Sequence, residues 1–304
     1  MSSVRLLAIG EVMAEIRTQG DGFAGGFAVG FAGDSYNTAI YAARQLGAPH
    51  QVGYMSRIGT DPLSQGLLDH ASAEGLDISH ITTDPERNIG IYAVATDASG
   101  ERSFSYWRAN SAARRLFTAP GPVPPLPQAE LVYLSGITLA ILTPPARLAL
   151  FEMLEEARSV HGIKLAFDSN FRPALWEDHQ TARAANDRMW QLADIALPSI
   201  DDEMELHGLD SEAAVVARFA ARDWDGIAIK RGALGPMSPH LAGAELPDFP
   251  PAPDVVDTTA AGDSFNGGYL AAFLAGADEA DRLAAGHRLA AQVVAVPGAI
   301  IPRS

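Results

Sequence analysis

The 304-residue chain contains no cysteine and only two lysines, Lys164 and Lys230. The absence of cysteine excludes disulfides, thiolate metal sites and cysteine nucleophiles. Basic residues are scarce as well: 22 Lys and Arg stand against 37 Asp and Glu, so the formal net charge is −15 at pH 7. We therefore expect neither nucleic acid nor an anionic membrane as a partner, because both attract clustered Lys and Arg. An anionic ligand has to be held by local groups.

Long apolar runs are missing too. The apolar run within residues 1–16 is too short for a signal peptide, and no segment approaches the length of a membrane span. The sequence thus predicts a cytoplasmic protein.

Several motifs of other enzyme classes are absent. Both lysines follow isoleucine, so there is no Gly-Lys-Ser/Thr phosphate loop, and no Gly-x-Gly-x-x-Gly motif joins a buried strand to a helix. The eight histidines form no His-Glu-x-x-His pair, and a Gly-x-Ser-x-Gly elbow is lacking. P-loop, dinucleotide-binding, zincin and α/β-hydrolase interpretations are therefore excluded.

The chain is 47% hydrophobic, enough for a sizeable core, and apolar strand patterns alternate with helical ones. This alternation predicts an α/β fold with a doubly wound, mostly parallel sheet and helices on both faces. Residues 89–108 depart from the rhythm, because they read as two strands around the turn at 97–100. With the Gly-rich region near 12–32, they predict a small β lid, from about 12–32 and 89–110, inserted in a single domain spanning 1–304.

Residues 255–276 carry the clearest local pattern. Val255 and Val256 suggest a strand end, and a helix with one apolar face follows until Gly276. Small residues 260–262 occupy the helix entrance, where free N–H groups and the helix dipole form an anion site. The acid at Asp263 is explained either as a first-turn residue favoured by the dipole or as a catalytic group.

Other polar residues follow predicted strands or begin helices, where ligands of doubly wound sheets collect. These clusters are Gly10-Glu11, residues 33–37, Asp168-Asn170-Arg172, Ser199-Asp202-Glu203, Lys230-Arg231-Gly232 and Asp257-Asp263.

Two segments carry a resemblance to a known family. DTTAAGDSFNGGYL, at 257–270, resembles the C-terminal signature of the ribokinase-like (PfkB) carbohydrate kinases, and FAGDSYNTAIYAARQLG, at 31–47, resembles their N-terminal glycine signature. Within the family the chain is most similar to kinases of 2-keto-3-deoxygluconate. That similarity lies in Gly10-Glu11, YWRANSAARRL at 106–116, DSNFRPALW at 168–176, LPSIDDE at 197–203 and GAIIPR at 298–303.

The resemblance implies a catalytic centre at the start of the C-terminal helix. Asp263 would be the general base for a primary hydroxyl, and the N–H groups of Ala260, Ala261, Gly262 and Asp263 would hold the migrating phosphoryl group. Ala260 replaces the family's usual glycine. Its N–H can still serve if its φ is negative.

The resemblance also implies ATP and Mg²⁺ as cofactors. The nucleotide-binding residues would be Asn170, Arg172, Ser199, Lys230, Gly232 and Gly235, with the N–H groups of 260–262. The family's Asn-x-x-Glu motif appears as Ser199 to Asp202. Asp202 or Glu203 would bind the metal, directly or through water, although both can equally be solvated first-turn acids.

Acceptor binding is assigned to short polar side chains and to the lid. The residues are Gly33, Asp34, Ser35, Tyr36, Asn37, Tyr92, Tyr106, Arg108, Arg172 and Asp263. Helix N-capping is the alternative for Asp34 and Ser35. Tyr106 and Arg108 share one face of an alternating strand, so both can point into a cleft; a solvated arginine at the sheet edge is the alternative for Arg108. Arg172 suits either a carboxylate or a phosphate, and its ligand is left open.

The resulting hypothesis is ATP-dependent phosphorylation of 2-keto-3-deoxygluconate at its primary hydroxyl, giving the 6-phosphate. A kinase of a neutral sugar such as fructose or ribose is one alternative, and a non-catalytic, kinase-like sugar-binding protein is another. The expected partners are the small sugar acid and ATP, and assembly into a homo-oligomer is left open.

Overall fold

A computed structural model describes residues 4–18, 25–47, 51–96, 102–118, 125–243 and 248–303. Its centre is a seven-stranded sheet in which every strand pair is parallel. The order is β11 (Gly226–Ile227), β10 (Ile195–Ala196), β9 (Lys164–Asp168), β8 (Ala129–Ser135), β1 (Val4–Ile9), β4 (Val52–Ile58) and β5 (Ile81–Thr83). The chain runs outward from β1 to β5 and then from β8 to β11, so the winding reverses between β1 and β8. Ligands of such sheets bind beyond the carboxyl ends of the strands at this reversal.

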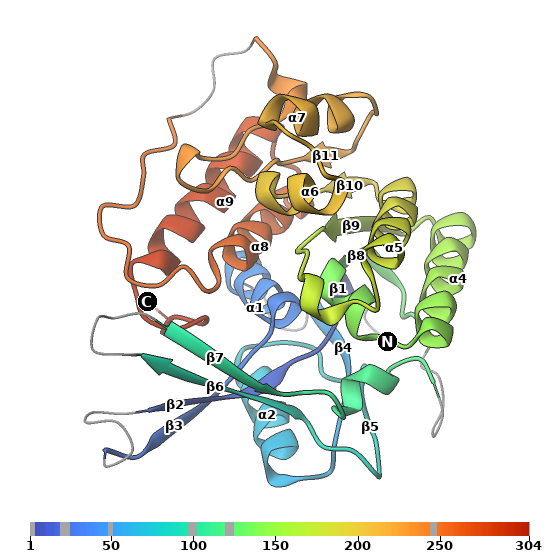
Figure 1. Ribbon diagram of the computed structural model, residues 1–304, viewed down its shortest axis with the longest axis vertical. Helices are drawn as coiled ribbons and strands as arrows, with labels where there is room; N and C mark the ends of the chain where they lie inside the picture. The colour runs from blue at the N-terminus through green and yellow to red at the C-terminus, as the bar shows by residue number, and fades with distance from the viewer. Residues whose placement is uncertain are drawn as a thin grey trace.

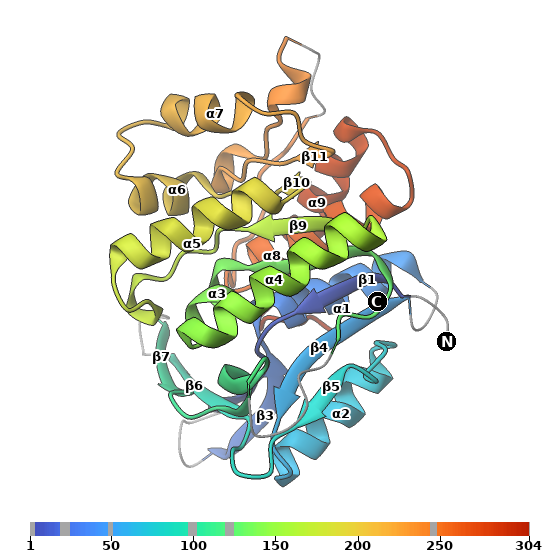
Figure 2. The same cartoon turned by 90° about the vertical axis from the view of Figure 1, so that its right-hand side faces the viewer.

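Helices cover both faces of this central sheet, as the sequence predicts (Figures 1 and 2). One face carries α1 (Asp34–Leu46), α2 (Pro62–Ala73), α8 (Ala261–Leu274) and α9 (Glu279–Val294). The other carries α3 (Gly136–Ile141), α4 (Pro144–His161), α5 (His179–Leu192), α6 (Ile200–His207) and α7 (Glu212–Ala220). Short 3₁₀ turns lie at Ala112–Arg115, Pro173–Leu175, Gly232–Leu234 and Pro239–Leu241.

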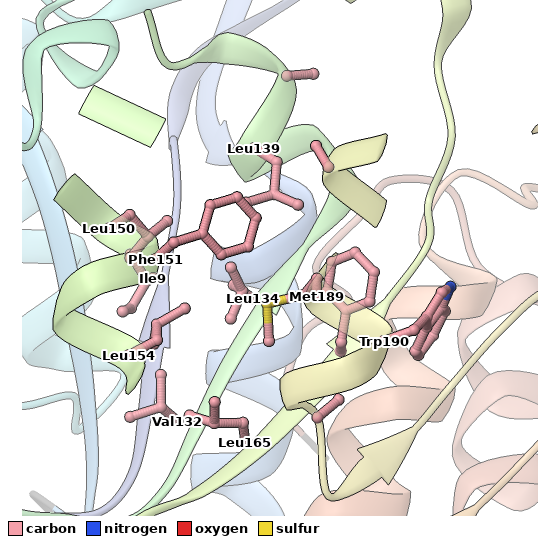
Figure 3. Close-up of a cluster of buried hydrophobic side chains, with 14 of the residues drawn as sticks. Ile9, Val132, Leu134, Leu139, Leu150, Phe151, Leu154, Leu165, Met189 and Trp190 are labelled. Atoms are coloured by element: carbon pink, nitrogen blue, oxygen red, sulfur yellow. The ribbon is translucent and has the colours of Figure 1, made fainter. Parts of the chain in front are cut away.

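Two hydrophobic cores result from strand alternation. Successive side chains of β1 point to opposite faces, so Leu7 and Ile9 belong to one core and Leu6 and Ala8 to the other. Figure 3 shows the first core, where strand residues meet α4 and α5. Because both faces are covered, the strands read as nearly continuous apolar runs.

A second, four-stranded sheet, here called the small sheet, lies across the carboxyl ends of β1 and β4 (Figure 1). Its order is β3 (Phe27–Ala32), β2 (Met13–Thr18), β6 (Gly90–Thr96) and β7 (Arg102–Trp107). The strands fall inside the two ranges expected for a β lid. The predicted turn at 97–100 and the glycines at 20 and 22 lie outside the described residues.

The helix predicted after residue 260 is α8, and the chain leaves it through Gly276 at φ 79°. The predicted strand end at Val255 and Val256 is wrong. Both side chains are exposed, and the Val256 and Asp257 N–H groups donate to the Val294 carbonyl at 2.8 and 3.0 Å. This segment is therefore anchored to the end of α9 and not to a sheet. Within the described part of the chain, no helix is both long and apolar enough to cross a membrane.

Candidate active site

A cleft of about 420 Å³ lies between the carboxyl edge of the central sheet and the small sheet. It brings together most residues proposed from the sequence: Gly33, Asp34, Asn37, Tyr92, Tyr106, Arg108, Asn170, Arg172, Ser199, Asp202, Lys230, Gly232, Gly262 and Asp263. A second cavity of about 390 Å³ adjoins it and adds Gly235 and Ala261. Lys230, Gly232, Thr258 and Gly262 line both spaces, which therefore meet at the start of α8.

A larger hollow, of about 930 Å³, lies between α1, α2 and the C-terminal segment. Its charged groups Arg44 and Arg303 are both paired with Glu74. The cleft is the better candidate because strand ends, a helix N-terminus and buried acids converge there, and the hollow has none of the residues proposed from the sequence.

Asp263 lies in the first turn of α8 and is only 8% exposed. The Asn37 amide donates a 2.8 Å hydrogen bond to Asp263 Oδ2. The Gly33 N–H donates to Asn37 Oδ1 at 3.3 Å, which fixes the orientation of that amide, and Thr38 Oγ1 donates to the Asp263 carbonyl at 3.1 Å. Helices α1 and α8 thus hold this carboxylate at the cleft.

The surroundings make Asp263 a strong base for a carboxylate. The pKa of Asp263 is raised to about 8, chiefly by burial and then by the charges of Asp34 and Asp168, whereas the Asn37 hydrogen bond and the charge of Lys230 oppose the rise. A general base works best when its pKa lies near the working pH. The arrangement therefore suits a group that takes a proton near neutrality.

The entrance of α8 differs in detail from the predicted anion site. Ala260 has φ −118°, so an alanine fits where the family usually has glycine, but its side chain packs in a hydrophobic cluster and lines neither space. The Ala261 N–H already donates to the Thr258 carbonyl at 3.2 Å. The N–H groups of Gly262 and Asp263 lie in the first turn, where an α-helix provides no acceptor for them. Of the four N–H groups predicted to hold an anion, those of Gly262 and Asp263 are therefore the best candidates.

Lys230 is held beside this entrance by a polar network. Its Nζ lies 2.5 Å from Asp168 Oδ2, and the Asn266 amide donates to the same oxygen at 2.6 Å and to the Tyr133 hydroxyl at 3.2 Å. We assigned no role to Asp168 or Asn266 from the sequence. The position of Asp168 directly after an apolar strand was the available signal, whereas Asn266 becomes visible only when α8 packs on the sheet.

Asp34 also lines the cleft. It accepts hydrogen bonds from the Ser135 hydroxyl and, at 3.1 Å, from the Asn170 amide, and burial raises its pKa. Asn170 has φ 29°, a conformation that asparagine tolerates better than most residues. The cap position of α1 is Gly33, so neither Asp34 nor Ser35 is the N-cap residue.

Ser35 and Tyr36 are corrections to the predicted acceptor set. Both are fully buried: Ser35 Oγ lies 3.1 Å from the Tyr54 hydroxyl, and the Tyr36 hydroxyl lies 2.7 Å from His70 Nδ1. The cause is helical geometry, since residues three apart share a face. Asp34 and Asn37 point into the cleft, and the two residues between them point into the protein.

The small sheet contributes Tyr92, Tyr106 and Arg108 to the cleft. The two tyrosine rings stack with centroids 5.8 Å apart, and the Tyr92 hydroxyl donates to Glu15 at 2.8 Å. Arg108 forms an ion pair with the buried carboxylate of Glu11. Arg108 is therefore an oriented but charge-compensated cation, and Glu11 is a site residue to which we gave no role from the sequence.

Arg172 and Asp202 line the cleft as well, with Arg172 Nη1 3.2 Å from Asp202 Oδ1. Burial, and then the charge of Asp168, raise the pKa of Asp202. Glu203 is a second correction: it is fully buried, accepts from Trp190 Nε1 at 3.2 Å and does not line the cleft. Successive residues of α6 point about 100° apart, so Asp202 lines the cleft and Glu203 does not.

The residues present fit magnesium through Asp202. Among the described residues, no three or more His, Asp or Glu side chains are grouped so that they could hold a metal ion. Mg²⁺ commonly keeps several waters and binds through one or two carboxylates together with substrate phosphates. Asp202, which lines the cleft, can serve as such a carboxylate.

The sequence pattern of the pfkB family of carbohydrate kinases matches residues 5–304. A 2-dehydro-3-deoxygluconokinase of Escherichia coli is 38% identical, and one of Dickeya dadantii 37%; each alignment covers 99% of this chain and 98% of the relative. The solved structure of aminoimidazole riboside kinase from Salmonella enterica, complexed with aminoimidazole riboside and an ATP analogue, has a TM-score of 0.78 at 25% identity, covering 97% of this chain and 95% of that one. This chain therefore belongs to the pfkB family of carbohydrate kinases.

Proposed function

We propose that the protein transfers the γ-phosphoryl group of ATP to the primary hydroxyl of 2-keto-3-deoxygluconate, giving the 6-phosphate. The observation that carries the proposal is the buried Asp263, with a pKa of about 8, in the first turn of a helix that opens into a cleft. Two relatives are named 2-dehydro-3-deoxygluconokinase, and 2-dehydro-3-deoxygluconate is a synonym of 2-keto-3-deoxygluconate; these names support the proposed acceptor.

The reaction follows from what stands at the α8 entrance. Asp263 takes the proton of the hydroxyl, whose oxygen attacks the γ-phosphorus, and the bond from that phosphorus to the bridging oxygen of ADP breaks. The N–H groups of Gly262 and Asp263 stabilise the negative charge of the transferred group. Base and anion site share one turn of helix because the proton has to leave as the phosphoryl group arrives.

The donor occupies the junction of the two spaces in this proposal. The phosphates lie beside Lys230, Gly232 and Gly262, and the base enters the adjoining cavity beyond Gly235. Asp202 would hold Mg²⁺, directly or through water, and the bound ion neutralises phosphate charge. Ser199 and Asn170, which line the same cleft, complete the polar surroundings.

The acceptor lies against the small sheet in this proposal. Tyr92, Tyr106 and Asp34 face its hydroxyl groups, and Arg108 or Arg172 binds its carboxylate. Both arginines are already paired with protein acids. The substrate carboxylate therefore joins an existing ion pair, and the guanidinium fork offers donors enough for two acceptors.

The test is a coupled assay of ADP release with ATP, Mg²⁺ and a panel of 2-keto-3-deoxygluconate, fructose and ribose. We expect the sugar acid to have the highest kcat/KM, and phosphorus NMR of its product to show a phosphate on C6. Equal or higher turnover of fructose or ribose would establish the neutral-sugar alternative. Binding of sugar without turnover of any acceptor would establish the non-catalytic one.

A further inference from the structure

We propose that this kinase discriminates weakly between purine bases, so that GTP and ITP replace ATP as donors with modest losses. The inference rests on the proposed function and refines its donor side. It follows from the groups that line the 390 Å³ cavity next to the cleft.

The wall of this cavity is mostly apolar. It is built by the turn after β11, by the loop before α8 and by α9, and its apolar side chains include Pro236, Ala252, Val255, Ala290, Ala291 and Val294. Such groups contact the faces of any aromatic ring by dispersion and burial. They do not read the hydrogen-bonding edge that distinguishes adenine from guanine.

The polar side chains that line the cavity in the described part of the chain are largely committed elsewhere. Arg231 donates to the Gly235 carbonyl at 3.1 Å, to Glu212 at 3.2 Å and to the Leu234 carbonyl at 3.1 Å. Lys230 is bound to Asp168, and Thr258 lies on the side shared with the cleft, where the phosphates are proposed.

His287 is the remaining polar side chain of that lining. Its Nε2 lies 2.8 Å from the Pro250 carbonyl, which can only accept, so Nε2 carries the donated proton. Nδ1 is then an acceptor. This single acceptor can form at most one hydrogen bond with the base. The bond would be to the amino group of adenine, so the side chains of the cavity favour adenine by one hydrogen bond at most.

The size of the expected preference follows from the chemistry of specificity. Sites that hydrogen-bond a substrate group reject analogues lacking it by about 10⁴ to 10⁵, whereas apolar pockets discriminate by about 10². We expect kcat/KM for GTP and ITP to lie within about a hundredfold of that for ATP. Most of the difference should appear in KM, because the base is remote from the transferred group.

The first experiment measures steady-state kinetics with ATP, GTP and ITP at saturating 2-keto-3-deoxygluconate, and calorimetric binding of ADP, GDP and IDP. A loss of more than about 10⁴ for GTP and ITP, or failure of GDP and IDP to bind where ADP binds, overturns the inference. Similar binding of the three diphosphates without turnover of any acceptor would refute the proposed function, while the weak discrimination between purine bases in binding would remain.

A pair of adjacent variants tests the location. Val255 and Val256 are both exposed, 63% and 51%, but only Val255 lines the cavity. Val255→Asp should raise KM by about tenfold for ATP and GTP alike, because an acid beside the ring costs apolar contact whichever base is bound. Val256→Asp adds the same charge one residue away and should change either KM by less than about twofold. Equal effects of the two variants, or an effect of Val255→Asp on one nucleotide alone, would overturn the inference.

Discussion

The central sheet and the small sheet differ in how far their strands are buried. All seven residues of β4 in the central sheet are buried, whereas β3 of the small sheet alternates between more and less exposed positions. Val29, Tyr106 and Trp107 of the small sheet are more than half exposed. A parallel sheet covered on both faces holds its strand ends rigidly, and a sheet covered on one face can present side chains to a ligand.

The division of the site follows this difference. Asp263, Asp168 and Lys230 belong to the central sheet and its helices, and Tyr106 and Arg108 come from the small sheet or the residue that follows it. Changes in the first set should therefore remove the chemistry. Changes in the second set should alter which acceptor is used.

Asp263→Asn tests the central part most severely. It should lower kcat by about two to four orders of magnitude, because a positioned general base contributes this much, while ADP still binds. Asp281→Asn is a matched control, since Asp281 is also a first-turn acid but is exposed on α9. Stopped assays of both variants at one pH decide the matter, and near-normal turnover of Asp263→Asn would reject it as the base.

Packing should show the next largest contrast. Leu134 of β8 is fully buried among the side chains of Figure 3, and Leu134→Ala should lower the free energy of unfolding by about 2 to 5 kcal/mol. Val29→Ser changes a 54% exposed position of the small sheet and should alter stability by less than about 1 kcal/mol. Urea unfolding followed by circular dichroism measures both. Equal losses would mean that the small sheet is as tightly packed as the core.

Arg108→Leu sharpens the role of the small sheet. It should raise KM for 2-keto-3-deoxygluconate by about ten- to a hundredfold and change the weak use of neutral ketoses little, because only a carboxylate loses a charge-assisted bond. Arg108→Lys keeps the positive charge but loses the planar guanidinium. Its KM for 2-keto-3-deoxygluconate should lie between that of the wild type and that of Arg108→Leu.

The same variants distinguish recognition from folding. The Arg108→Leu substitution leaves the buried Glu11 without its ion-pair partner. The thermal unfolding of this variant is therefore measured together with its kinetics. An equal loss for both acceptor classes would make Arg108 a residue that supports the small sheet. If the activity on neither acceptor class changes, Arg172 becomes the candidate for binding the substrate carboxylate.

The pH dependence should show the most graded effect. Since the pKa of Asp263 is raised to about 8, the free enzyme holds the proton at neutral pH, and kcat/KM should rise about tenfold per pH unit up to that pKa and then level. The stability of the fold should decrease over the pH range in which kcat/KM increases. Between about pH 4 and 8 the native state keeps a proton that the unfolded chain has released, so the free energy of unfolding falls as pH rises, by at most about 1.4 kcal/mol per unit.

Asp263→Asn is the reference for both curves. Its residual activity should lack the inflection near pH 8, and its stability should lack the corresponding fall. A wild-type kcat/KM profile that is flat between pH 6 and 9 would contradict a raised pKa for the base. Buffers of constant ionic strength are needed, because the net charge of −15 makes stability sensitive to salt.

Local patterns were sufficient for much of the fold. The helix after residue 260, its end at Gly276 and the two strands on either side of residues 97–100 agree with prediction, because caps and apolar periodicity are properties of adjacent residues. The strand end predicted at Val255-Val256 was wrong because that prediction also used only adjacent residues. Its preference for strand is real, but the backbone there bonds to α9.

The candidate site divides in the same way. Asp263 was selected because acid, small residues and helix start are contiguous in a segment that resembles a family signature. Ser35 and Tyr36 were wrongly included because a motif names neighbours along the chain, whereas a helix separates neighbours onto different faces. Glu203 failed as a metal ligand for the same reason.

The sequence by itself determined the alternation of strands and helices, the place of α8 and the acid in its first turn. Only the tertiary structure decided which groups surround that acid. Asn37 meets Asp263 across 226 positions, and Glu11 pairs with Arg108 across 97 positions, so no local pattern could show either contact. The raised pKa of Asp263 has the same origin, because burial and the charges of Asp34 and Asp168 act through space once the sheet and helices have closed around it.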